Sequence, residues 1–123
     1  EGDDATIIDF EGEPARPLAW RRAKRTPLRD AAGMLRSFDY VAHSERLLGV
    51  PGSVPEWAGD AWASAAKEEF WAAYRGAIQP GILPADPAPL LDLALLEKAV
   101  YELRYELNNR PSWVAIPLRA FPG

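Results

Sequence analysis

Three clusters of proline and glycine divide most of this sequence into segments, and their spacing is the feature that most constrains the fold. The clusters lie at Gly49–Pro55, Gln79–Pro89 and Arg110–Pro111. Proline lacks the amide hydrogen that a helix interior needs, and glycine is costly there, so helices tend to end at such clusters. Each intervening segment is long enough for several turns of helix. The punctuation therefore predicts a helix over residues 28–48, a second that starts within residues 53–57 and runs to about 78, and a third over residues 90 to about 108.

Apolar side chains recur every three or four residues within each segment, as they do on one face of an amphipathic helix. In the first segment the stripe consists of Leu28, Ala31, Ala32, Leu35, Phe38 and Ala42. The second segment has a weaker stripe of alanines and aromatics, namely Trp62, Ala65, Ala66, Phe70, Ala73 and Tyr74. In the third segment the stripe consists of Leu96, Val100, Leu103 and Leu107, with Ala99 beside it. We expect these stripes to face a shared core.

The remaining parts of the chain are shorter. Residues 5–10 are rich in β-branched residues and predict a short strand, which the acidic residues 1–4 precede as the turn of a hairpin. Residues 11–27 are expected to be irregular, and the apolar tail at 113–121 is expected to pack on the helices. The predicted fold class is mainly α, with a short N-terminal strand or hairpin followed by three main helices in a single domain over residues 1–123.

Composition excludes several classes of protein. The net charge of -4 argues against a nucleic-acid partner, because such proteins usually carry a strongly basic surface. The absence of cysteine excludes disulfides and thiolate metal sites, and it fits a reducing compartment. No apolar run approaches the roughly 18 residues that a membrane span needs, and no secretion leader opens the chain. We therefore expect a cytoplasmic protein that binds neither nucleic acid nor membrane.

Three acids at alternate positions follow the predicted strand. Asp9, Glu11 and Glu13 lie around Gly12 in the stretch IIDFEGEP. Hard cations such as Mg²⁺ are bound through one or two carboxylates together with substrate phosphates, and an acid at the end of a strand is well placed for this. An ordinary solvated turn after an edge strand has the same pattern, so the spacing alone leaves both interpretations open.

The third predicted helix carries a polar and aromatic strip. At about 100° per residue, one side of the helix collects Lys98, Tyr101, Glu102, Tyr105 and Asn109. Aromatic bodies suit the apolar faces of sugar rings, and polar tips suit their hydroxyls, so the strip predicts a sugar-binding surface. The alternative is a solvated face with pairs such as Lys98–Glu102. The sole histidine, His43, is expected at the surface or in packing, because no serine or cysteine nucleophile is paired with it by any motif.

Three stretches in order, IIDFEGEP, PLRDAAGMLRSFDY and LEKAVYELRYELNNRP, resemble the bacterial maltokinases. That family includes the kinase portion of trehalose synthase–maltokinase fusions, and its fold is similar to those of aminoglycoside phosphotransferases and protein kinases. The resemblance implies transfer of the ATP γ-phosphate to maltose, giving maltose 1-phosphate. It covers nearly the whole chain but only the C-terminal part of the helical lobe of such a kinase.

The resemblance also implies roles for individual residues. Asp9 matches the Mg²⁺-binding acid of the family, and Glu11 matches a further acid that acts as a metal or water-mediated ligand. Asp30 matches a structural acid that opens a core helix, and its place in a first helical turn suits the helix dipole. The tyrosine-rich helix matches the part of the lobe that lines the sugar pocket. The cofactors implied are Mg²⁺ and ATP.

The chain contains no catalytic residue of such a kinase. No phosphate-covering loop, no phosphate-binding strand lysine and no His-Gly-Asp catalytic loop occur in the sequence. We therefore expect no kinase activity from the 123 residues alone. The implied partners are maltose or a related sugar, and the missing N-terminal part of the kinase or a trehalose synthase domain. We also expect apolar surface that favours a homodimer.

Two other functions fit the residues. One is a non-catalytic helical binding module derived from a kinase lobe. The other is a metal-dependent hydrolase built on Asp9, Glu11 and Glu13, which would need more ligands than these three acids.

Overall fold

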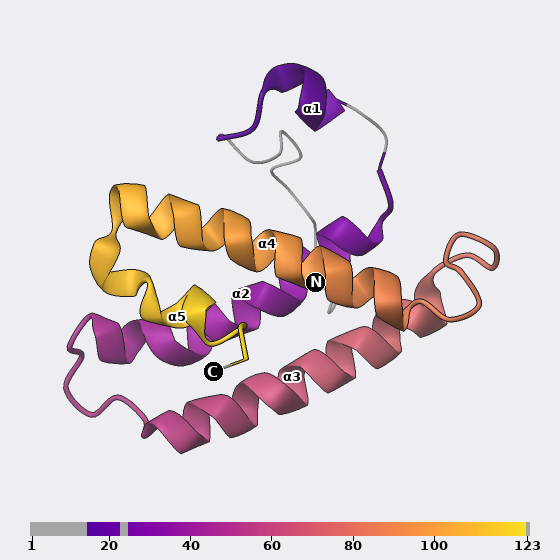
Figure 1. Ribbon diagram of the computed structural model, residues 1–123. Helices are drawn as coiled ribbons and strands as arrows, with labels where there is room; N and C mark the ends of the chain where they lie inside the picture. The colour runs from indigo at the N-terminus through magenta and orange to yellow at the C-terminus, as the bar shows by residue number, and fades with distance from the viewer. Residues whose placement is uncertain (1–14, 23–24, 123) are drawn as a thin grey trace, which may run out of the picture.

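The computed structural model describes residues 15–22 and 25–122, and this part of the chain is helical throughout its regular structure (Figure 1). The elements are α1 Leu18–Arg22, α2 Leu28–Leu47, α3 Glu56–Ala77, α4 Ala88–Asn109, the 3₁₀ turn η1 Pro111–Trp113 and α5 Ala115–Leu118. The mainly α fold class and the three long helices are confirmed, with boundaries within a few residues of those predicted. The predicted strand at residues 5–10 lies outside the described residues. Helix α1 occupies a stretch that was expected to be irregular, so that prediction was wrong.

Local chemistry accounts for the ends of α2. The helix begins directly after Pro27, whose ring sets a helix-compatible φ of -63°. At the other end Gly49 has φ +68°, a left-handed conformation that glycine adopts without strain. The Gly49 amide donates to the Arg46 carbonyl at 3.1 Å, and the Val50 amide donates to the Glu45 carbonyl at 3.0 Å. This pair of bonds is a Schellman motif, which satisfies the free carbonyls of the last turn.

Proline also sets the starts of α3 and α4. Helix α3 follows Pro55 and ends where Ile78 turns to an extended backbone. Helix α4 follows Pro87 and carries a proline in its first turn, where the missing amide costs nothing. It ends at Arg110, because a residue that precedes a proline is disfavoured in the helical region.

Helix α2 is the centre of the structure and packs against both α3 and α4 (Figure 1). The core joins the first two turns of α2 to the start of α4 through Leu28, Ala32, Leu35, Leu91 and Ala94. Aromatic residues of α3 cover this core from the other side, among them Phe70, Trp71 and Tyr74. The predicted stripe of α2 therefore faces the core as expected, and burial of its aliphatic residues is the main stabilising contribution at this end.

A glycine brings α2 and α3 into close contact. Gly59 is buried, and a Cβ built on it would lie 2.8 Å from the backbone carbonyl oxygen of Ala42. Ala63, one turn further along α3, is 3% exposed. Small residues at this crossing let the two backbones approach. The predicted stripe of α3 faces the core only in part, because Ala65 and Ala73 are exposed.

The C-terminal segment folds back onto the long helices, as the sequence predicts. Ile116 and Pro117 of α5 are buried. The ring of Trp113 stacks on Tyr40 of α2 with centroids 6.3 Å apart, and the guanidinium of Arg110 lies 4.1 Å from the Trp113 ring centroid. These contacts attach the end of α4 to α2.

The orientation of α4 differs from the predicted one. Leu96, Val100 and Leu107 are 47%, 44% and 58% exposed, whereas Glu102 and Glu106 are 8% and 1% exposed. The expectation that the leucine stripe faces the core was therefore wrong within the described residues. The physical reason is that α2 offers a hydrogen-bond donor to each glutamate, the Arg36 guanidinium to Glu102 and the Tyr40 hydroxyl to Glu106. No helix in the described part of the chain is both long and apolar enough to cross a membrane.

Candidate functional site

A buried ion pair joins α2 to α4 at the middle of the interface. The Nε and Nη2 atoms of Arg36 donate to Oε2 of Glu102 at 3.0 and 2.8 Å, and Nη1 donates to Oδ2 of Asp39 at 2.7 Å. Burial raises the pKa of Glu102 above its usual range, and the hydrogen bonds from Arg36 oppose that rise. A buried carboxylate needs such a partner, because water no longer stabilises its charge.

A second connection lies one turn further along both helices. The Tyr40 hydroxyl donates to Oε1 of Glu106 at 3.0 Å, and Arg110 donates to both carboxylate oxygens at 2.6 and 3.0 Å. Burial is the main cause that raises the pKa of Tyr40, and the nearby charges of Glu102 and Glu106 raise it further. The phenol therefore keeps its proton and acts as a donor to Glu106.

A cavity of about 300 Å³ opens between α2 and α4 beside these connections. Its lining residues are Gly33, Ser37, Tyr40, Lys98, Glu102, Tyr105, Glu106 and Arg110. The lining combines carboxylate acceptors with hydroxyl, ammonium and guanidinium donors, and this combination matches the mixed donor and acceptor character of sugar hydroxyls. We call this space the α2/α4 cavity.

A second hollow of about 240 Å³ lies on the neighbouring side of α4. It is lined by Ala15, Arg16, Glu97, Val100, Tyr101, Arg104, Tyr105, Asn108 and Asn109. The guanidinium of Arg16 and the ammonium of Lys98 lie 4.8 and 4.9 Å from the ring centroid of Tyr101. Cations at this distance from an aromatic face are attracted to it, so they hold the tyrosine ring in place.

The structure thus divides the five predicted sugar-binding residues between two spaces. Lys98 and Glu102 line the α2/α4 cavity, Tyr101 and Asn109 line the second hollow, and Tyr105 lines both. Tyr105 is 41% exposed, which leaves its ring available to a ligand. Their role in binding stays a prediction, but Glu102 differs from the expected solvent-facing group because it is buried and paired with Arg36.

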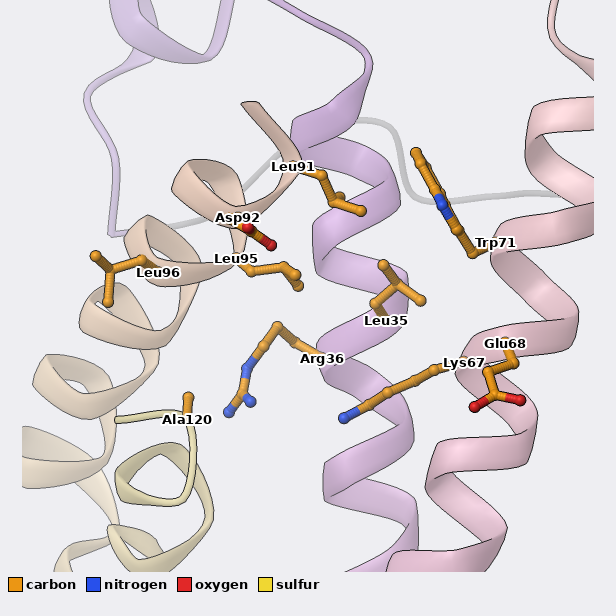
Figure 2. Close-up of a pocket in the computed structure, with 10 residues that line it drawn as sticks. All are labelled: Leu35, Arg36, Lys67, Glu68, Trp71, Leu91, Asp92, Leu95, Leu96 and Ala120. Carbon is orange, nitrogen blue, oxygen red and sulfur yellow. The ribbon is translucent and has the colours of Figure 1, made fainter. Parts of the chain in front are cut away.

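An apolar cleft of about 550 Å³ lies between α3 and α4, over α2 (Figure 2). It is lined by Leu35, Arg36, Lys67, Glu68, Trp71, Leu91, Asp92, Leu95, Leu96 and Ala120. Figure 2 shows Leu91 and Leu95 directed from α4 toward α2, and Trp71 directed from α3 toward the same space. The Lys67 ammonium bonds Oδ1 of Asp39 at 2.5 Å, so the charge at one end of the cleft is already paired.

The predicted metal site consists of three acids near the N-terminus. Asp9 and Glu11, together with Glu13, lie outside the described residues and remain a prediction. Within residues 15–22 and 25–122, no group of three histidine or acidic residues is arranged to hold a metal ion. Asp30 is exposed in the first turn of α2, at the positive end of the helix dipole, which is compatible with its predicted structural role.

Sequence reasoning missed the residues of α2 that face α4. Arg36 and Tyr40 are four residues apart, as are Glu102 and Glu106, and four residues correspond to about one helical turn. Two matched pairs at this spacing were a signal that the two helices meet along these positions. His43 was expected at the surface or in packing; it is 3% exposed, and its Nε2 lies 3.1 Å from Oδ1 of Asp60. It is therefore a packing residue.

Comparison with known proteins connects this geometry to a class of enzyme. No family model matches the chain. The chain is 32% identical over 116 residues to a glucosamine kinase of Streptacidiphilus jiangxiensis. The match covers 90% of this chain and 25% of the kinase, so the chain spans about a quarter of the length of that relative. The chain is therefore related to part of a sugar kinase, which confirms the kinase relationship predicted from the three motifs.

Proposed function

We propose that this chain is a helical segment of an ATP-dependent sugar kinase and that it forms part of the sugar-acceptor site. The observation that carries the proposal is the α2/α4 cavity, whose mixed donors and acceptors lie in a chain that matches a quarter of a glucosamine kinase. The three motifs that resemble maltokinases support the same class of reaction.

Each lining residue has a distinct task under this proposal. Glu102 accepts a hydrogen bond from a sugar hydroxyl and Lys98 donates one, while Glu106, 1% exposed, holds Tyr40 and Arg110 in place beneath the cavity. Tyr105 lies between the two hollows and offers its ring face to the sugar ring. Arg36 and Arg110 hold the two carboxylates in place, so the acceptor groups are oriented before the ligand arrives.

Phosphoryl transfer needs groups that the sequence does not supply. The ATP and Mg²⁺ implied by the resemblance would be held in part by Asp9, with Glu11 as a further ligand. The metal would neutralise the charge on the phosphates during transfer. The general base and the phosphate-binding lysine have no counterpart in the sequence. The isolated chain should therefore be inactive with ATP, Mg²⁺ and sugar.

The identity of the sugar is the finer part of the proposal. The motif resemblance implies maltose, whereas the relative is named for glucosamine. We propose maltose as the acceptor and treat glucosamine as the second candidate. A chimera tests both candidates and the class of reaction together. In this chimera the matching quarter of the Streptacidiphilus kinase is replaced by this chain, and phosphorylation of the two sugars is measured with ATP and Mg²⁺.

The chimera should phosphorylate a sugar, and it should prefer maltose to glucosamine. Tyr105→Ala and Lys98→Ala should each raise KM for the sugar several-fold with little change in KM for ATP. Glu45→Gln, an exposed change on α2, is the matched control and should alter neither constant. A folded chimera that phosphorylates neither sugar would contradict the proposal.

A further inference from the structure

Helix α4 carries an apolar ridge that faces away from the core. Leu93, Leu96, Val100 and Leu107 are 59%, 47%, 44% and 58% exposed, and partly buried Leu103 lies on the same line. At about 100° per residue, these five positions fall within roughly a quarter of the helix circumference. We call this set of five side chains the α4 ridge. Single exposed leucines are ordinary, but a continuous row along a whole helix marks an interaction surface.

Bonds between α2 and α4 prevent the ridge from turning inward. Glu102 is bonded to Arg36 and Glu106 to Tyr40, so rotation of α4 would break a buried ion pair and a hydrogen bond to a buried carboxylate. The ridge therefore points outward because of specific bonds on the opposite side of the helix.

The ridge is continuous with hollows on both sides. Leu96 belongs to the ridge and also lines the apolar cleft of Figure 2, while Val100 belongs to the ridge and lines the second hollow. The whole surface is thus a convex row of side chains with a concave apolar space beside it. A single segment that covers the row and enters the cleft fits this shape. A dimer in which the ridges of two copies pack against each other fits it less well.

From this surface we infer that the α4 ridge and the adjoining cleft bind an apolar segment of the remaining kinase polypeptide. The inference rests on the proposed function. The length comparison supports this occupant, because three quarters of the Streptacidiphilus kinase has no counterpart in this chain. A segment with apolar side chains at helical or strand spacing meets the requirement. A second copy of the chain and the chain's own residues 1–14 are the competing occupants that the test separates.

The test compares two valine substitutions in two contexts. Val100→Glu places a charge on the ridge, and Val41→Glu places the same charge at an exposed valine of α2, 60% exposed, as the matched control. In the isolated 123-residue chain both variants should unfold at the temperature of the parent. In the chimera described above, Val100→Glu should lower Tm by several degrees or more, and Val41→Glu should leave it unchanged.

Each contrary outcome overturns the inference in a recognisable way. A chimera that tolerates Val100→Glu shows that the kinase does not cover the ridge. A large loss of Tm on Val100→Glu in the isolated chain shows that the chain's own residues cover the ridge. A dimer of the isolated chain that Val100→Glu dissociates shows that a second copy is the occupant. If the chimera is insoluble, the same two substitutions at the aligned positions of the Streptacidiphilus kinase provide the Tm comparison.

The same experiment keeps the inference separate from the proposed function. Tm reports coverage of the ridge, whereas sugar phosphorylation by the unsubstituted chimera reports the acceptor role. A stable but inactive chimera that is sensitive to Val100→Glu contradicts the function and supports the docking surface. An active chimera that tolerates Val100→Glu supports the proposed function and contradicts the docking surface.

Discussion

The two sides of α2 are packed by different chemistry. On the α3 side the contact depends on a close backbone approach at Gly59 and on aromatic contacts such as Phe38 with Trp62, whose centroids are 6.0 Å apart. On the α4 side the apolar core is joined by two buried bonds, the ion pair of Arg36 with Glu102 and the hydrogen bond from Tyr40 to Glu106. An ion pair also links α3 to α2, between Lys67 and Asp39, but that pair is more exposed than the pair of Arg36 with Glu102.

This difference has a consequence for function. The close approach at Gly59 fixes the distance between α2 and α3 at that point. Bonds between charged groups fix the rotation of a helix, because each donor must meet its acceptor. The rotation of α4 determines that the acceptor groups line the α2/α4 cavity and that the apolar ridge faces outward. The α4 side of α2 is therefore the side that positions the candidate site.

The largest effect is expected from breaking the buried ion pair. Arg36→Ala leaves the buried Glu102 without its guanidinium partner, whereas Asp39 keeps Lys67. Removal of one partner of a buried pair costs about 3–5 kcal/mol. Urea unfolding of the isolated chain measures this cost. Arg46→Ala is the control, because its pair with Glu56 is largely exposed and such a pair contributes at most about 1 kcal/mol.

The pH dependence sharpens this prediction. Because burial raises the pKa of Glu102 in the folded state, the folded protein takes up a proton more readily than the unfolded chain does. The contribution of this group to stability is present below its unfolded pKa and is lost as the pH rises through the folded pKa. Without Arg36 the pKa should rise further, so the cost of Arg36→Ala should be smaller at acidic pH than at neutral pH. An equal cost of Arg36→Ala at acidic and at neutral pH would contradict the conclusion that Glu102 is charged in the parent at neutral pH.

A smaller loss is expected on the α3 side of α2. In Gly59→Ala the new methyl group meets the Ala42 carbonyl oxygen, and the helices must move apart, which costs about 1–3 kcal/mol. Gly76→Ala in the same helix has nothing within 4 Å of the added carbon. It should stabilise the protein by roughly 0.5–1 kcal/mol, because alanine favours the helix more than glycine does. Equal effects of the two changes in urea unfolding would rule out the close contact.

Removal of the Tyr40 hydroxyl should have a moderate effect that shrinks at alkaline pH. Tyr40→Phe leaves Glu106 with Arg110 as a partner and should cost about 1 kcal/mol near neutral pH. The raised pKa of Tyr40 means that its contribution is complete below its ordinary value of 10.0 and is lost as the pH rises above it. Thermal unfolding from pH 8 to about pH 11 should therefore show a steeper loss of Tm in the parent than in Tyr40→Phe. Parallel curves would show that the phenol titrates normally.

The smallest effect is expected for the ridge in the isolated chain. Val100→Glu and Val41→Glu both alter exposed positions, and surface changes of this kind are usually within about 0.5 kcal/mol. If the two variants have equal Tm in the isolated chain but different Tm in a complete kinase, the ridge is a docking surface that the isolated chain leaves uncovered. Thermal unfolding of the two variants side by side measures it.

Part of the fold was predictable from local pattern. The proline and glycine clusters determine where α2, α3 and α4 begin and end, and the stripe of Leu28, Ala32 and Leu35 determines the buried side of α2. Helix α1 was missed, because prolines and charged residues surround it and five residues carry little periodic signal. The predicted sugar-binding residues were placed on one strip of α4, whereas the structure divides the five between two hollows, and their role in binding stays a prediction.

By itself the sequence determined the number, type and boundaries of the long helices, because these depend on interactions between residues close in the chain. It also carried the three motifs that relate the protein to a sugar kinase. The tertiary structure alone decided which side of α4 faces inward. Periodicity placed Leu96 and Val100 inside, but the match of Glu102 and Glu106 with Arg36 and Tyr40 turned the helix the other way. Unpaired charges cost more to bury than leucines cost to expose, so the partners on α2 determined the outcome.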